Sequence, residues 1–266
     1  CSGRGNTPTP RKWLFGHLLA AGLIALFLTA GFWQLDRLDQ RLASNALTEL
    51  RMEREPAPLR TLLRQDDAAA LEYRRATVEG TYQPGYEVLL RSKVRGGEAG
   101  WHVLTPLLLP DGHAVLVDRG WVPYQLDEPP VEEASPPAGT VEVVGYMHPG
   151  QVPPTGFLAN FAPRDPVEGE LERAYYVDLE RLQPQIPWPL EPAYLSLIEE
   201  VPAASGELPL APQRPVVTDQ GSHLGYAVQW FSFALIGVIG YALLLRKVLR
   251  DANGPRKDGG LPGATA

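Results

Sequence analysis

The sequence predicts a membrane protein in which two transmembrane helices flank a mainly antiparallel, β-rich external domain, either a small barrel or a sheet, of the α+β class. Two runs of 22 residues, 14–35 and 224–245, contain no Asp, Glu, Lys or Arg. At 1.5 Å per helical residue, each run is long enough to cross the ~30 Å hydrocarbon core of a bilayer. Between them, short β-type segments alternate with turn signals, which is typical of antiparallel hairpins.

These observations divide the chain into five parts. We expect a tail at residues 1–13, a transmembrane helix at 14–35, the external domain at 36–222, a second transmembrane helix at 223–245 and a tail at 246–266. Basic residues precede the first apolar run, as they do in a secretory signal. The run is longer than a signal core and a second run follows, so we expect an uncleaved anchor.

The distribution of basic residues predicts the orientation. The two tails together carry eight Lys and Arg residues, and the inner flanks carry five. Because basic residues stay on the cytoplasmic side, both tails are expected in the cytoplasm and the domain outside it. Residues 36–222 hold 29 acidic and 16 basic residues, a net charge of −13. This charge argues against nucleic acid as a partner, whereas the two spans require a lipid bilayer.

Six segments of the domain are predicted to be strands: 73–82, 86–92, 101–109, 113–122, 140–147 and 193–201. Pro110, Asp111 and Gly112 predict a hairpin turn. Pro106 predicts an edge or a bulge, because proline cannot donate to a β-ladder. Asp178 is a candidate N-cap of a short helix. The first long helix is expected to continue through 36–53 as a solvated connector, and the 18 prolines from 123 to 215 are expected in surface loops.

Patterns of catalytic residues are missing from the sequence. It has no Gly-x-Ser-x-Gly, His-Glu-x-x-His, phosphate-loop or Gly-x-Gly-x-x-Gly motif, and Cys1 is its one cysteine. We therefore expect no enzymatic activity and no Cys-based metal or redox site. The histidines His102, His113 and His148 lack the close spacing of a metal site and are expected to be surface or turn residues.

His223, at the start of the second apolar run, has two interpretations. It is either an ordinary interfacial residue or a lone axial ligand of haem iron, with Ala227, Trp230 and Ala234 as apolar walls on the same helical face. From the residues alone we favour the interfacial role. His17 lies at the opposite end of the first run and is too distant in depth to share an iron with His223. Small residues, Gly16 with Ala20 or Ala21 with Ala25, are expected to let the helices pack closely.

Four segments occur in a fixed order: "GFWQLDRLDQR" (31–41), "GWHVLTPL" (100–107), "LVDRGWVP" (116–123) and "HLGYAVQWF" (223–231). In this order, around one external domain, they resemble the surfeit locus protein 1 (Surf-one, Shy-one) family of cytochrome c oxidase assembly factors. The sequence departs from that pattern in two places. Asp118 stands where asparagine is usual, and Gly221 with Ser222 replaces the usual pair of asparagines.

The resemblance implies a protein of the bacterial inner (plasma) membrane that binds haem a and aids its insertion into the oxidase catalytic subunit, alongside other assembly factors. It also implies that His223 is the axial ligand of the haem iron, with Tyr226 and Trp230 beside it. The alternative is a cofactor-free structural chaperone that stabilises an assembly intermediate of the oxidase.

The resemblance also points to further motif residues: Trp33, Gln34, Arg37, Gly100, Arg119, Gly120 and Trp121. We favour structural roles over ligand contact for most of them. The first three are expected to anchor the helix at the membrane interface, and the last three to form a turn and its packing.

Overall fold

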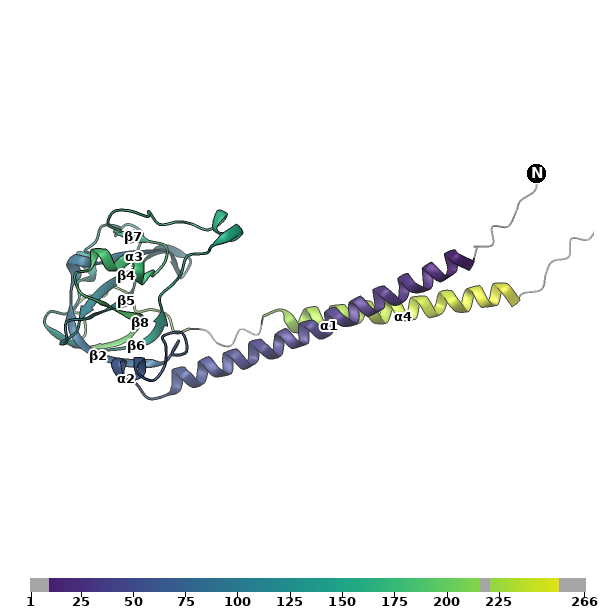
Figure 1. The fold of residues 1–266 in the computed structure, drawn as a ribbon, viewed down its shortest axis with the longest axis horizontal. Coiled ribbons are helices and arrows are strands. Elements are labelled where there is room, and N and C mark those ends of the chain that lie inside the picture. The colour runs from purple at the N-terminus through teal and green to yellow at the C-terminus, as the bar shows by residue number, and fades with distance from the viewer. Residues whose placement is uncertain (1–9, 216–220, 254–266) are drawn as a thin grey trace, which may run out of the picture. The chain divides into compact units, whose positions relative to one another are not determined.

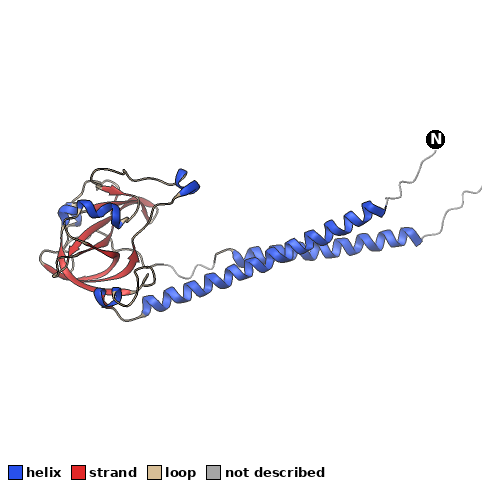
Figure 2. Ribbon diagram, viewed as in Figure 1, coloured by secondary structure: helices blue, strands red, loops and turns tan. Residues whose placement is uncertain are grey.

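The structure is a computed structural model that describes residues 10–215 and 221–253. The chain forms two compact units, and each is described by itself. One unit comprises Cys1–Ser44 and Thr218–Ala266, and the other comprises Asn45–Val217. Figures 1 and 2 show long helices in the first unit and the β-sheet in the second.

The first unit consists mainly of two long helices, although the last residues of the first helix, 45–53, are counted in the second unit. Helix α1 spans Pro10–Glu53 and helix α4 spans His223–Asn253. Both are long and apolar enough to cross a membrane, and only 6% of the most apolar window of each is buried. A core helix of a soluble protein would instead be mostly buried, so the two helices suggest a membrane protein. As expected, α1 continues well past residue 35.

The second unit is built on eight strands, in the order β1-β2-β6-β8-β5-β4-β3-β7. Their bounds are β1 Ala57–Pro58, β2 Arg75–Tyr82, β3 Val88–Arg95, β4 Glu98–Leu108, β5 Ala114–Pro123, β6 Thr140–Pro149, β7 Arg173–Ala174 and β8 Leu190–Val201. The short helices are α2 Leu59–Leu63, α3 Leu179–Leu182, η1 Pro84–Tyr86, η2 Glu132–Ala134, η3 Gly156–Asn160 and η4 Gln183–Gln185.

The sheet closes on itself. Strand β2 pairs with β6 along its length and also with β4 at its end, through Thr81↔Leu108 and Tyr82↔Leu107. The closed ring is therefore β2-β6-β8-β5-β4. Side chains from these strands, including Val117, Val143 and Leu195, form one fully buried cluster inside it. Because successive strand residues point to opposite faces, the other face of β3, β4 and β5 packs on α3 and η4.

The strand predictions are confirmed: all six segments form strands, and the sheet is mostly antiparallel. The pairs β5–β8, β1–β2 and β3–β7 are parallel. Strands β1 and β7, which have two residues each, were not predicted. Asp178 caps α3 as predicted, because its Oδ1 accepts a hydrogen bond from the Arg181 amide at 3.1 Å.

Pro106 lies where β4 changes partner. Its pairing with β3 ends at Leu104, and its pairing with β2 begins at Leu107. The Pro106 carbonyl accepts a hydrogen bond from the Gln83 amide at 2.8 Å. The proline nitrogen points to the same side of the strand, into the gap between the two partners, where no donor is needed.

Candidate functional site

The face that joins α1 to α4 follows a spacing of three and four residues. On α1, the least exposed positions include Trp13, His17, Ala20, Ile24, Phe27, Gly31 and Gln34. On α4, they include His223, Ala227, Trp230, Ala234, Gly237 and Tyr241. This alternation keeps one stripe of each helix turned to the other, as in an antiparallel coiled coil. Figure 1 shows the two helices side by side.

His223 occupies the first turn of α4 and is half-buried. Its Nδ1 lies 2.9 Å from Oε1 of Gln34. An amide oxygen only accepts hydrogen bonds, so Nδ1 carries the proton in this contact and the lone pair of the neutral ring lies on Nε2. A metal-binding histidine is commonly oriented in this way by an acceptor on its other ring nitrogen.

Glycine at position 31 lets the helices approach beneath His223. A Cβ at Gly31 would lie 2.7 Å from the ring of Phe231. One turn deeper, Phe27 stacks on Trp230 with ring centroids 5.8 Å apart. Close packing is therefore built from Gly31, Ala227 and Ala234. The prediction of Ala21 with Ala25 is wrong, because both side chains are exposed.

The side chains expected to wall a haem, Ala227, Trp230 and Ala234, do share one face of α4. That face is turned to α1, and Ala227 and Ala234 are almost fully buried there. Tyr226 is instead 49% exposed. The imidazole of His223 is thus held in a fixed orientation, but the side chains predicted to contact haem pack against α1 instead.

The remaining α1 motif residues surround Gln34 on the exposed side. Trp33 is exposed, and the Arg37 guanidinium carbon lies 5.8 Å from its ring centroid. Arg37 also donates a hydrogen bond to Gln40 at 2.9 Å. Contacts of this kind suit residues at a membrane interface.

A second polar contact lies near the other end of the helix pair, where His17 Nδ1 hydrogen-bonds to the Tyr241 hydroxyl. A cavity of about 380 Å³ adjoins it, lined mainly by apolar residues such as Trp13, Leu23 and Leu244. His17 and His223 therefore have different partners on different layers of the helix pair.

In the second unit (Asn45–Val217), called the barrel unit below, Arg119 is completely buried. Its Nη1 donates to the carbonyl of Ala134 at 2.7 Å and lies 3.6 Å from the carboxylate of Glu87. Burial raises the pKa of Glu87 despite the hydrogen bonds from Thr105 and Val131 and the nearby guanidinium. The pair fixes β5 to the segment around η2, which is a structural role.

Gly120 and Trp121 contact the chain segment around Leu210, which follows β8. The Trp121 amide and carbonyl both hydrogen-bond to Leu210, at 2.8 Å each. Gly120 has φ +130, and a Cβ there would lie 2.2 Å from the Leu210 carbonyl oxygen. Gly100 is equally constrained, because its Cβ would meet the Val122 carbonyl oxygen at 2.2 Å. Arg95 adds hydrogen bonds to the carbonyls of Leu210 and Ala211.

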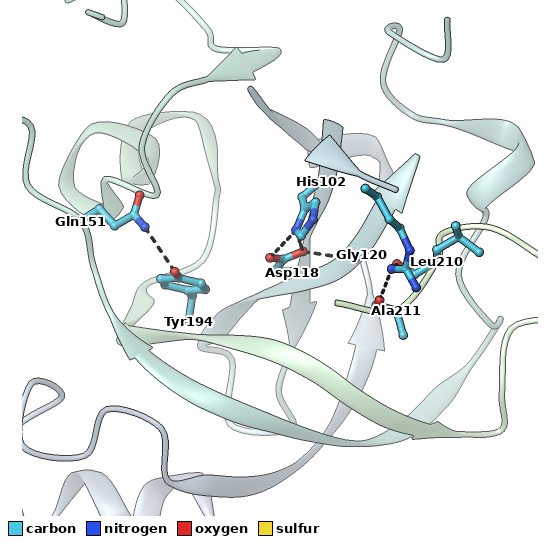
Figure 3. A network of polar contacts seen from close by, with 8 residues as sticks. His102, Asp118, Gly120, Gln151, Tyr194, Leu210 and Ala211 are labelled. Atoms are coloured by element: carbon cyan, nitrogen blue, oxygen red, sulfur yellow. Dashed lines mark hydrogen bonds and ion pairs between the residues drawn. The ribbon is translucent and has the colours of Figure 1, made fainter. Parts of the chain in front are cut away.

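His102 and His148 line one polar cavity of about 330 Å³ in the barrel unit. His102 Nδ1 contacts both carboxylate oxygens of Asp118, at 3.0 and 2.8 Å, as Figure 3 shows. His148 stacks on Tyr194, and burial lowers its pKa to about 4. The prediction that both are surface or turn residues is wrong, because both lie in strands, β4 and β6, and their side chains are only 18% and 16% exposed. It is confirmed for His113, which lies exposed beside the turn.

Within the described residues, no group of three or more His, Cys, Asp and Glu side chains is arranged to hold a metal ion. The indole Nε1 of Trp121 is buried without a hydrogen-bond partner beside the same cavity.

Comparison with known proteins identifies the group to which the chain is related. The family model described as SURF1 family matches residues 21–235. The chain belongs to the SURF1 family. A SURF1-like protein of Mycobacterium tuberculosis is 29% identical over 92% of this chain and 90% of its own length. A SURF1-like protein of Monosiga brevicollis is 30% identical over 88% of each chain.

One relative carries a functional name. The cytochrome oxidase assembly protein SHY1 of Saccharomyces cerevisiae is 30% identical over 113 residues, which is 42% of this chain and 28% of the yeast protein. The SURF1 family therefore includes a cytochrome oxidase assembly protein, and the resemblance inferred from the four sequence segments is confirmed.

The structure brings the predicted residues of this SURF1 family member together in two groups. Gln34 and His223 are hydrogen-bonded on the helix pair, and Trp230 lies about two turns further along the same face of α4. In the barrel unit, Gly100 packs on Trp121, next to Gly120 and Arg119. Gln34 was expected as an interfacial anchor, and its hydrogen bond to His223 was not predicted. The wide separation of the two residues in the chain gave no signal of that contact.

Proposed function

We propose that the protein is a cytochrome oxidase assembly factor that binds haem a as cargo through His223 and aids its insertion into the catalytic subunit. Membership of the SURF1 family and the name of the yeast relative support the assembly role. A role in assembly rather than catalysis also agrees with the absence of catalytic motifs from the sequence.

The observation that carries the haem proposal is the 2.9 Å contact between His223 Nδ1 and Gln34 Oε1. A neutral imidazole whose Nε2 bears the lone pair is a suitable axial ligand for haem iron. Gln34 fixes the ring orientation and the tautomer, so less ordering remains to be done when the iron binds.

The packed face of α4 sets where the porphyrin would lie. Because Ala227 and Ala234 are buried against α1, the ring plane cannot enter between the helices at that depth without separating them. Haem must instead approach from the outer side of His223, where Tyr226 is exposed. The backbone conformation of Gly221 explains why glycine can stand where the family usually has asparagine. Its φ of +66 lies in the left-handed region, which glycine and asparagine adopt most readily.

We further propose that the tails are cytoplasmic, the barrel domain external and the membrane the bacterial inner membrane. The excess of Lys and Arg on the tails supports this orientation. Partners would then be the oxidase catalytic subunit and other assembly factors.

A cofactor-free structural chaperone remains the second candidate, and one observation favours it. The three residues expected as haem walls lie on the face of α4 that packs against α1, where Ala227 and Ala234 are almost fully buried and Trp230 stacks on Phe27. In that case the barrel domain would stabilise an oxidase intermediate, and other proteins would insert the haem.

The deciding experiment compares His223→Ala with His17→Ala, both purified from cells that make haem a. The two histidines lie on the same helix pair and each has one interhelical hydrogen bond. We expect the absorption spectrum of His223→Ala to lose the haem bands and that of His17→Ala to keep them. Full haem content in His223→Ala would refute the ligand assignment. Haem-free wild-type protein that co-purifies with the oxidase subunit would support the structural chaperone.

A further inference from the structure

The loop that follows β6 lacks charge in an otherwise strongly charged domain. Residues 150–163 contain no Asp, Glu, Lys or Arg, although residues 36–222 hold 45 of them in all. The loop includes η3 (Gly156–Asn160). In Figures 1 and 2, η3 lies away from the strands of its own unit.

Large apolar side chains of this loop are exposed to solvent. Phe157 and Phe161 are each 76% exposed, and Val152 is 83% exposed. The two phenylalanine rings contact one another edge to face, with centroids 5.3 Å apart. An exposed cluster of this kind costs solvation free energy and commonly marks an interaction surface.

Hydrogen bonds hold both ends of this loop in place. At one end, the Gln151 amide donates a hydrogen bond to the Val177 carbonyl at 2.8 Å, and the Val177 amide donates one to Oε1 of Gln151 at 3.0 Å. At the other, Asp165 accepts from the Tyr175 amide at 2.9 Å. Arg164 donates to the Ala159 carbonyl at 2.9 Å, which ties the loop to itself.

We propose that this loop inserts its phenylalanine pair into the interfacial region of a lipid bilayer. Aromatic side chains are favoured at that depth, and insertion of an uncharged segment desolvates no ionised group. The two long apolar helices of the chain also keep the domain tethered to a membrane. This inference does not depend on haem binding.

The test uses the full chain in phosphatidylcholine nanodiscs, with Cys1→Ser to remove the native thiol. Thr155→Cys places an environment-sensitive fluorophore in the exposed part of the loop and leaves both phenylalanines intact. Val94→Cys, on β3 and 66% exposed, is the matched control. We expect blue-shifted emission at position 155, with quenching by doxyl-labelled lipid, and neither effect at position 94.

A second pair of measurements isolates the phenylalanines. Phe157→Ser with Phe161→Ser, in the Thr155→Cys background, should abolish the lipid quenching without lowering the thermal unfolding midpoint, because both rings are exposed. Solvent-like emission at position 155 in the parent protein would overturn the proposal. Lipid quenching that survives the double substitution would overturn it as well. A blue shift without lipid quenching would show that the loop binds protein instead.

Discussion

At the scale of single residues, the motif glycines act through the side chain they lack. Gly120 combines a left-handed φ of +130 with a backbone oxygen only 2.2 Å from the position of a Cβ. Backbone atoms cannot move aside as a flexible side chain can, so any substitution must displace the Leu210 segment or strain β5.

We therefore predict that Gly120→Ala lowers the free energy of unfolding of the barrel unit by on the order of 3 kcal/mol or more. Gly112→Ala is the matched control, because its φ is +84 but a Cβ there meets nothing within 4 Å. That control should cost only about 1 kcal/mol. Thermal unfolding followed by circular dichroism would measure both, and equal midpoints for the two variants would contradict the packing argument.

His148 predicts a pH dependence of stability. Burial lowers its pKa from 6.5 to about 4, so between these values the unfolded chain binds a proton that the folded protein does not. The free energy of unfolding should fall as pH decreases from 6.5 to 4, by up to about 3 kcal/mol, and be unaffected by this group above pH 6.5. Asp118 opposes this lowering of the pKa and Lys93 adds to it, and the Glu72 carboxylate lies 3.9 Å from Nδ1 of His148.

His148→Phe provides the comparison, since it keeps a ring against Tyr194 and Tyr73 but does not titrate. Unfolding midpoints measured from pH 4 to 8 should decline less steeply in the variant on the acid side. Other groups, such as Glu87, titrate in both proteins and cancel in the difference. Parallel curves would show that His148 is not held neutral.

The sequence analysis found residues such as His223 because a local motif surrounds them. His102 and His148 were misplaced because they are 46 positions apart in the chain and share a cavity only through the strand order β6-β8-β5-β4, which puts both side chains on the same outer face of the sheet. Likewise, Asp118 was seen as a departure from a motif, but not as the partner of His102. Contacts between residues far apart in sequence are set by strand order, which periodicity does not reveal.

At the scale of elements, the helix pair depends on where small side chains fall. The sequence contains many alanines and glycines in both apolar runs, and composition alone does not say which face they occupy. Ala234 is 3% exposed against α1, whereas Ala25 is exposed. Only the three- and four-residue spacing of the facing positions distinguishes them.

We predict that Ala234→Leu forces the helices apart and that Ala25→Leu does not, because only the former adds volume to a close-packed interface. A Cβ at Gly237 would lie 3.4 Å from Cγ1 of Ile24. Disulfide formation between cysteines introduced at these two positions, in a Cys1→Ser background, therefore reports the separation of the helices. Efficient cross-linking in the Ala234→Leu protein would contradict the observed packing.

The strands were predictable because their hydrophobic segments are local, but the closure of the barrel was not. Closure rests on two residue pairs between β2 and β4, and β6, β8 and β5 lie between these two strands around the rest of the ring. The two-residue strands β1 and β7 carry no periodicity at all. Each is defined only by its pairing with a longer strand, β1 with β2 and β7 with β3.

At the scale of the whole molecule, charge divides the chain. The domain between the helices is acidic and the two tails are basic, and the positive-inside rule turns this division into an orientation. The same acidity would repel the domain from an anionic lipid surface. The uncharged loop at 150–163 is therefore the part best suited to approach lipid.

We predict that Ser205→Cys reacts with a membrane-impermeant maleimide in intact spheroplasts, whereas Arg250→Cys reacts only after permeabilisation, each in a Cys1→Ser background. Both positions are exposed, on the barrel unit and on α4 respectively. Labelling yield on the purified protein is the control for intrinsic reactivity. The reverse pattern would place the barrel domain in the cytoplasm and remove the basis for an external role.

The two interhelical hydrogen bonds restrict how this chain can change by insertion and deletion. His17 and Gln34 are separated by 17 positions on α1, and His223 and Tyr241 by 18 on α4. One residue added between either pair would turn the helix by about 100° and carry one polar side chain into lipid while the other stayed bonded. Lipid-facing positions can be exchanged freely, but the number of residues between the bonded layers is fixed. Descendants of this chain should therefore vary in composition along these helices and conserve their length.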